Sequence, residues 1–159
     1  MRLKKLQPKK KLQLKKVTNT QGNNMETLKG GCILINKANK CIGLIYRGEL
    51  NDFTYPKGHL EPGEDLMTCA IRETAEETKR VAVVVDEEPI IERYTTPKGE
   101  QCCTYMYLAV DNGHSDNDSL EVHDLLWVPV EDVEDKLSYT GLKVVWRQVK
   151  ENVLKILSQ

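Results

Sequence analysis

Residues 58–80 read GHLEPGEDLMTCAIRETAEETKR and contain six acidic side chains. Pro62 and Gly63 turn the chain, and the acids Glu64 and Asp65 follow where a helix N-terminus favours negative charge. The spacing predicts a helix over 65–78 with a small, apolar face that packs on a sheet. That face carries Met67, Ala70, Ile71, Thr74 and Thr78, and the opposite face carries Cys69, Arg72, Glu73, Glu76, Glu77 and Arg80.

Three glutamates, Glu73, Glu76 and Glu77, lie close together on the charged face. Like charges three or four residues apart on a helix repel by about 0.2–0.5 kcal/mol per pair. Two arrangements offset this repulsion: a solvated face paired with Arg72 and Arg80, or a bound cation. Mg²⁺ takes oxygen ligands and is typically held by few carboxylates together with substrate phosphates. The glutamates therefore favour phosphate chemistry with Mg²⁺, and Mn²⁺ is the alternative ion.

Two residues before the helix agree with a phosphate site. Gly58 has no Cβ, so its carbonyl can approach a metal or a phosphate closely. Lys57 beside it offers a cation for phosphate oxygens. Both belong to the candidate site.

Charge is distributed unevenly along the 159 residues. Residues 1–24 hold eight basic residues and no acidic one, whereas residues 25–159 carry 15 basic and 24 acidic side chains. We expect a disordered basic tail over 1–24, with RNA contact as one interpretation of it, and one domain over 25–159.

No apolar run reaches the roughly 20 residues of a membrane span. Five cysteines without a C-x-x-C pair favour buried thiols in the cytoplasm.

The remaining segments alternate between strand and helix patterns. GGCILIN and CIGLIYRG predict a hairpin, VAVVV, PIIERY, QCCTYMYLAV and LLWVPV predict further strands, and DNGHSDNDS predicts a polar loop. From about Gly141 an apolar stripe predicts a closing helix. The fold class is therefore α/β, with helices packed on a sheet.

Gly58, five residues, Glu64, seven residues and RETAEET closely resemble the Nudix box, G-x5-E-x7-R-E-U-x-E-E-x-G-U with U aliphatic. Six of its seven glycine or charged positions are filled. The late glycine is Lys79, where glycine would end the helix in a left-handed conformation, so Lys79 implies strain or a different helix exit. The resemblance covers roughly residues 29–157. It implies an α/β/α sandwich with a mixed sheet, the box helix and a C-terminal helix.

The resemblance also implies roles for residues. A Nudix enzyme uses Mg²⁺ and water to cleave a nucleoside diphosphate linked to another group. The implied metal ligands are Gly58, Glu73, Glu76 and Glu77, and the residues that steady the loop and helix are Arg72 and Glu64. Glu73 is the first choice for the general base. Glu121, which lies in the loop before the predicted strand that contains Trp127, is the second choice.

The segment YPKGHLEPGED most resembles the corresponding segment of the asymmetric diadenosine tetraphosphate hydrolases. Lys57 would then lie along the phosphate chain, and one of the tyrosines would stack on an adenine, with Tyr55 beside Lys57 in the predicted site. The other tyrosines considered are Tyr94, Tyr105 and Tyr107. The substrate would be a small nucleotide, and no membrane partner is expected. The sequence does not determine the oligomeric state.

Three alternatives stay open at this stage. CAIRE after PKG also resembles mRNA decapping enzymes, for which a Lys-rich tail suits RNA. A diphosphoinositol polyphosphate substrate needs a basic pocket, which is hard to place in an acidic domain. A Nudix domain that binds nucleotides without catalysis is the third, and the retention of every expected carboxylate argues against it.

Overall fold

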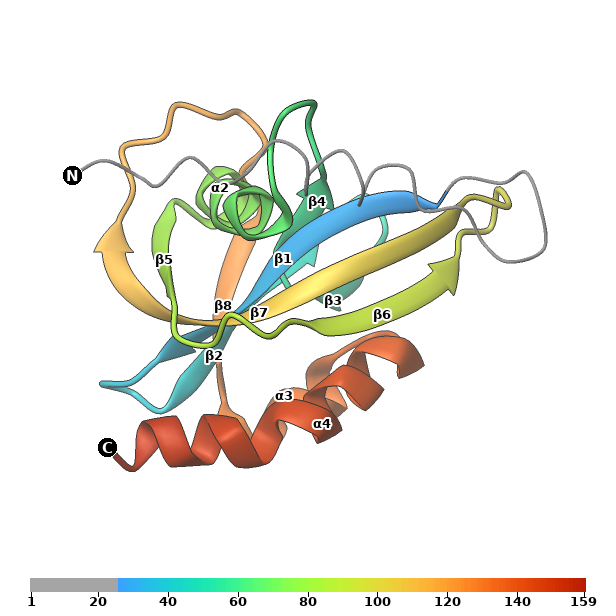
Figure 1. Ribbon diagram of the computed structural model, residues 1–159. Coiled ribbons are helices and arrows are strands. Elements are labelled where there is room, and N and C mark those ends of the chain that lie inside the picture. The colour runs from blue at the N-terminus through green and yellow to red at the C-terminus, as the bar shows by residue number, and fades with distance from the viewer. Residues whose placement is uncertain (1–25) are drawn as a thin grey trace.

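The computed structural model describes residues 26–159 (Figure 1). The predicted tail over 1–24 lies outside the described residues. The elements are β1 (Thr27–Asn36), β2 (Cys41–Arg47), β3 (Asp52–Thr54), β4 (Lys57–His59), α2 (Leu66–Thr78), β5 (Arg80–Val84), β6 (Ile90–Thr95), β7 (Gln101–His114), β8 (Asp124–Pro129), the 3-10 turn η1 (Val130–Asp132), α3 (Val133–Lys136) and α4 (Thr140–Leu157).

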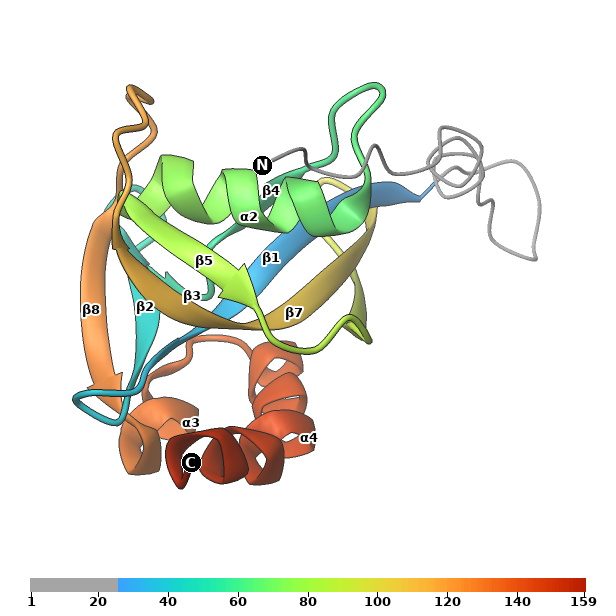
Figure 2. The same ribbon diagram turned by 60° about the vertical axis from the view of Figure 1, so that its left-hand side comes forward.

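All eight strands form one mixed sheet. The order is β3-β2-β1-β7-β5, and β4 pairs with β1, β6 with β7 and β8 with β2. Strands β1 and β7 run parallel, and the other pairs are antiparallel. Helix α2 covers one face, while α3 and α4 cover the other (Figures 1 and 2). The predicted α/β/α sandwich with a mixed sheet is confirmed.

Strand β1 is buried on both faces, as the unbroken apolar run CILI indicates. Side chains alternate along a strand, so its residues divide between two cores. Cys32 and Leu34 pack with Leu66 and Ala70 of α2. Ile33 and Ile35 join the larger core that includes α4. The central strands β1 and β7 thus fix the distance between the two helical layers.

One predicted loop is wrong in part. Strand β7 continues to His114 through the turn-forming residues at 111–114. The antiparallel partner β5 explains this, because Arg80 pairs with His114 and Ala82 with Asp111 across the two strands. The Arg80 guanidinium also forms an ion pair with the Asp111 carboxylate at 2.7 Å. Arg80 therefore faces β7 and does not pair with the glutamates of α2.

The cysteines of the described residues are all free, and four of the five are buried: Cys32, Cys69, Cys102 and Cys103. This confirms the prediction of buried thiols for those four. Within residues 26–159, no helix has the length and apolar character that crossing a membrane requires.

A glycine lets helix α2 approach the sheet. A Cβ at Gly30 would lie 2.7 Å from the carbonyl oxygen of Leu66 and 2.9 Å from the amide nitrogen of Ala70. Both atoms are helix backbone, which cannot move aside as a flexible side chain can. The close contact brings the carboxylates of α2 against β1 and β4.

We expect Gly30→Ala to lower the free energy of unfolding by about 1–3 kcal/mol, because the added methyl group overpacks the contact with α2. Chemical denaturation measures the change. Gly48→Ala is the matched control, since its new Cβ would meet nothing closer than Tyr46 at 3.8 Å. Equal stability of the two variants would contradict the close-contact account.

Candidate functional site

Helix α2 begins shortly after the turn at Pro62 and Gly63. Asp65 is the N-cap, and its Oδ1 accepts a hydrogen bond of 2.8 Å from the amide of Thr68. This satisfies one of the free amides of the first turn. The predicted helix is confirmed, with Leu66 as its first residue and Thr78 as its last.

The charged face of α2 is more deeply buried than its periodicity indicates. Cys69 is fully buried, and the exposed fractions of Glu73 and Glu77 are 7% and 8%. The reason lies in the glycines of β1 and β4, which let the helix sink onto the sheet along this face. A Cβ at Gly58 would lie only 2.1 Å from the carboxylate of Glu73. Gly58 therefore serves the site by its missing side chain, and its carbonyl accepts a weak hydrogen bond from the Cys69 thiol at 3.5 Å.

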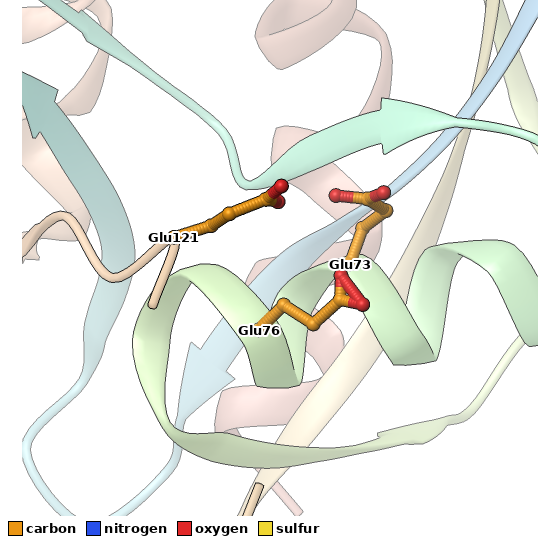
Figure 3. A group of neighbouring side chains, drawn as sticks. All are labelled: Glu73, Glu76 and Glu121. Atoms are coloured by element: carbon orange, nitrogen blue, oxygen red, sulfur yellow. The ribbon is translucent and has the colours of Figure 1, made fainter. Parts of the chain in front are cut away.

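Three carboxylates gather beside the helix (Figure 3). Glu73 and Glu76 come from α2, and Glu121 reaches in from the loop between β7 and β8. One oxygen of each lies within 4.8 Å of the other two. Glu121 thus joins the glutamates of the box, although 44 residues separate it from Glu77 in the chain.

Glu77 is not one of these three, although the charges of Glu73 and Glu121 act on its carboxyl group. Its Oε1 accepts a 2.8 Å hydrogen bond from the backbone amide of Lys57, and its Oε2 lies 3.6 Å from Nε2 of His123. The structure therefore brings the predicted ligands Glu73 and Glu76 together with Glu121, and it also ties Glu77 of α2 to strand β4.

Arg72 connects the loop before the helix to the carboxylates. Its guanidinium donates to both oxygens of Glu64, at 2.6 and 2.9 Å, and to the carbonyl of His59 at 3.0 Å. Nη1 also donates to Glu73 at 2.9 Å and to Glu76 at 3.0 Å. One cation thereby offsets the repulsion among the glutamates and fixes their side chains.

The carboxyl groups of the site differ in pKa because their electrostatic environments differ. Burial raises the pKa of Glu64, but the hydrogen bonds and charge of Arg72, together with hydrogen bonds from the Glu61 amide and Cys69, leave that pKa below its usual value. Burial raises the pKa of Glu73, helped by the charges of Glu76 and Glu121 and opposed by Arg72. Burial raises the pKa of Glu77 to about 8. Glu73 and Glu77 are therefore the groups of this site that hold protons most readily.

A second polar group lies on the other face of β4. The Nζ atoms of Lys29 and Lys57 lie 3.1 and 3.4 Å from the hydroxyl of Tyr94, and Lys57 Nζ lies 4.7 Å from the centre of its ring. Burial lowers the pKa of Lys29, yet its interactions with Tyr94, Cys102 and Glu100 together leave the pKa above its ordinary value. Sequence reasoning missed Lys29, because only the pairing of β1 with β4 brings it beside Lys57.

The predicted role of Tyr55 is wrong. Its side chain is 0% exposed and belongs to the core between the sheet and α4, where its hydroxyl donates to the carbonyl of Leu142. The ring cannot stack on a base without unpacking that core. Tyr107 is also buried, and of the two candidate tyrosines that are only partly buried, Tyr94 and Tyr105, it is Tyr94 that lies beside Lys57.

The donor set at the three carboxylates fits a divalent cation. All three side chains offer oxygen, and neither sulfur nor imidazole belongs to the group. Such sets suit hard cations, Mg²⁺, Mn²⁺ or Ca²⁺, and give no preference for zinc or copper. Glu73 and Glu76 supply ligands from adjacent turns of a rigid helix, so their spacing does not depend on a mobile loop.

The model of the family described as "NUDIX domain" matches residues 26–147. The chain belongs to the Nudix family. Two curated relatives are similar to it: an 8-oxo-(d)GTP phosphatase of Mycolicibacterium smegmatis, 34% identical over 70% of this chain, and a putative mutator protein MutT4 of Mycobacterium tuberculosis, 32% identical over 67%. The aligned regions span only 34% and 44% of those two proteins.

Solved structures of Nudix proteins share the fold. A crystal structure of C. elegans Ap4A hydrolase has a TM-score of 0.66 and 26% identity, covering 82% of this chain and 99% of that one. A binary complex of a C. elegans Ap4A hydrolase has a TM-score of 0.62 and 26% identity, covering 81% and 98%. A Nudix hydrolase from Nitrosomonas europaea, at 19% identity and a TM-score of 0.65 over 82% and 90%, supports the fold alone.

Lys79, which replaces the late glycine of the Nudix box, takes the backbone conformation that glycine would have there. Lys79 adopts the left-handed conformation, with φ 59° and ψ 30°, and its amide donates to the carbonyl of Ala75. The helix therefore ends as it would with glycine. A residue with a Cβ pays roughly 1–2 kcal/mol for this conformation. Lys79 thus carries strain, and the exit of the helix is unchanged.

The burial of Glu77 predicts a pH-dependent stability for the metal-free protein. Its pKa is about 8 in the folded state, against an ordinary value of 4.5. Between these values the folded state holds a proton that the unfolded state has lost, so stability falls as pH rises. The loss attributable to this group is on the order of a few kcal/mol from pH 5 to pH 8.

Melting curves in EDTA across this range test the prediction. Glu77→Gln cannot ionise and keeps an oxygen for the Lys57 amide, so it should gain stability over wild type at pH 8 and little at pH 5. Glu87→Gln, at an exposed turn position, should follow the wild-type curve. A difference between Glu77→Gln and wild type that does not change with pH would contradict the assignment.

Proposed function

We propose that this protein is a Mg²⁺-dependent hydrolase that cleaves a pyrophosphate bond in a nucleoside diphosphate linked to another group. The observation that carries the proposal is the group of Glu73, Glu76 and Glu121 oxygens within 4.8 Å of one another. Membership of the Nudix family supports it. Glu73, Glu76 and Glu121 would hold the ion, with Mn²⁺ as the alternative. The other two predicted ligands, Glu77 and the Gly58 carbonyl, would add oxygen ligands from the neighbouring helix turn and from β4.

A divalent ion held there supplies charge neutralisation for phosphate oxygens and makes a bound water more acidic. The protein's own groups do the rest. Glu73 is the first candidate to accept the proton of the attacking water, and Glu121 is the second. Arg72 and Glu64 are positioning residues, because they hold the loop and the helix in fixed geometry through two hydrogen bonds.

The favoured substrate is a dinucleoside polyphosphate such as diadenosine tetraphosphate. Adjacent residues of β4 point to opposite faces, so Gly58 adjoins Glu73 while Lys57 reaches Tyr94. Among the described strands, β4 pairs only with β1, and on its other edge the amide of Lys57 donates to the Glu77 carboxylate, so this edge adjoins the glutamates of α2. A polyphosphate chain that passes β4 would lie between the three carboxylates and the two lysines, Lys29 and Lys57. The similarity to the C. elegans Ap4A hydrolases agrees with this choice.

A second candidate is hydrolysis of an oxidised nucleoside triphosphate. The similarity to the 8-oxo-(d)GTP phosphatase of Mycolicibacterium smegmatis favours it. Both candidates use the same carboxylates and differ in the leaving group. The free cysteines support a reducing compartment, and we propose the cytoplasm.

Product analysis with Mg²⁺ tests the function. The panel comprises diadenosine tetraphosphate, 8-oxo-dGTP, ADP-ribose, capped RNA and a diphosphoinositol polyphosphate. We expect ATP and AMP from the first. Glu76→Gln should lower kcat/KM by more than the about 10–100-fold that loss of a supporting residue costs at a metal site. Glu49→Gln, on the exposed turn after β2, should have no effect. Nucleotide binding without turnover of any compound would contradict the enzyme proposal in favour of a sensor.

The two lysines predict a dependence on phosphate chain length. Lys29→Ala and Lys57→Ala each remove a charged hydrogen-bond donor, and we expect kcat/KM for diadenosine tetraphosphate to fall about 10–100-fold, mainly through KM. For ADP-ribose, which has two phosphates, the decrease should be smaller. Lys37→Ala, in the exposed turn after β1, is the control. Equal losses for both substrates would exclude a contact with the longer chain.

A further inference from the structure

The loop between β7 and β8 is attached to the C-terminal end of helix α2 (Figure 2). At its start, the amide of Ser115 donates to the carbonyl of Lys79 at 2.9 Å. At its end, the amide of His123 donates to the carbonyl of Glu77 at 2.9 Å. Both ends of the segment 115–123 are therefore fixed to the last turn of the helix that carries Glu73 and Glu76.

Within this loop, polar side chains hold the backbone at every second residue. Ser115 Oγ accepts from the amide of Asn117, Asn117 Oδ1 from the amide of Ser119, and Ser119 Oγ from the amide of Glu121, at 3.3, 2.7 and 3.0 Å. These turns lead directly to Glu121. The position of the Glu121 backbone thus depends on where 117 and 119 are held.

The side chain of Lys79 holds those two positions. Its Nζ donates to the carbonyl of Asn117 and to the carbonyl of Ser119, the latter at 3.0 Å. The same residue has the left-handed φ of 59°. Glycine would satisfy the backbone requirement more easily, but only a long donor can also reach the loop. The strain at Lys79 therefore accompanies a contact that glycine could not make.

We propose that Lys79 is a positioning residue that holds the carboxylate of Glu121 beside Glu73 and Glu76 by fixing the loop at 115–121. The inference rests on the proposed function, in which these three carboxylates hold a divalent cation. Lys79 touches neither substrate nor cation in this role and acts through Glu121.

Electrostatics and tethering predict opposite results for removal of Lys79. Loss of a positive charge near a cation site, taken alone, strengthens cation binding. Loss of the tether weakens it, because Glu121 no longer stays within reach of the other two carboxylates. The sign of the change in Mn²⁺ affinity therefore distinguishes them.

The experiment uses the full chain, with Mn²⁺ binding followed by electron paramagnetic resonance and amide hydrogen exchange measured without metal. Lys79→Gly and Lys79→Asn both tolerate the left-handed backbone but cannot span the distance to the loop. We expect about tenfold weaker Mn²⁺ binding and about tenfold faster exchange at 115–123. Lys40→Gly is the matched control: Lys40 also has a positive φ, of 54°, and lies in the exposed turn after β1. It should change neither quantity.

A double-mutant cycle with Glu121→Gln completes the test. If Lys79 acts through Glu121, Lys79→Gly should cause no further loss of Mn²⁺ affinity in the Glu121→Gln background. An equal loss in both backgrounds, or unchanged or tighter Mn²⁺ binding by Lys79→Gly, would overturn the inference and leave the metal site intact. A wild-type protein that binds no Mn²⁺ would overturn the proposed function, and the inference with it.

Discussion

The interaction on which the site depends is the set of hydrogen bonds around the Arg72 guanidinium. Glutamates crowded on one helix face repel one another, and burial against the sheet makes their charges more costly still. Arg72 places one planar cation among Glu64, Glu73 and Glu76. The fork of donors suits several carboxylates at once, which a lysine at this position could not reproduce. The turn before the helix and the helix itself are thereby held as one unit.

Glu77 forms no ion pair with Arg72, and burial raises the pKa of its carboxyl group. Its carboxyl group faces the backbone of β4, and its pKa is raised where that of Glu64 is lowered. Two glutamates of one sequence motif thus have opposite electrostatic environments. Burial raises the pKa of Glu77, and hydrogen bonds led by those from Arg72 lower the pKa of Glu64, although both residues belong to the same short segment of chain.

Strand β4 is short, yet it separates two kinds of chemistry. One face presents Gly58 to the carboxylates, and the other presents Lys57 to Lys29 and Tyr94. Acidic and basic groups can therefore lie close together without neutralising each other. The arrangement suits a ligand that carries both a bound cation and an extended chain of phosphates, which is the chemistry that we propose for this protein.

Local spacing in the sequence determined the helix, its start at the Pro-Gly turn, and the positions of Arg72, Glu73 and Glu76 on one side of it. Residues three and four apart on a helix must be neighbours, so no other part of the chain was needed. The family resemblance named Glu121 as a candidate base, but only the tertiary structure placed its carboxylate beside Glu73 and Glu76. The tertiary structure alone decided that Lys29 joins Lys57 and that Tyr55 lies in the core. These outcomes depend on strand register and loop attachment between segments far apart in the chain. It also decided which groups the side chain of Lys79 contacts, because its Nζ donates to carbonyls 38 and 40 residues away, at Asn117 and Ser119.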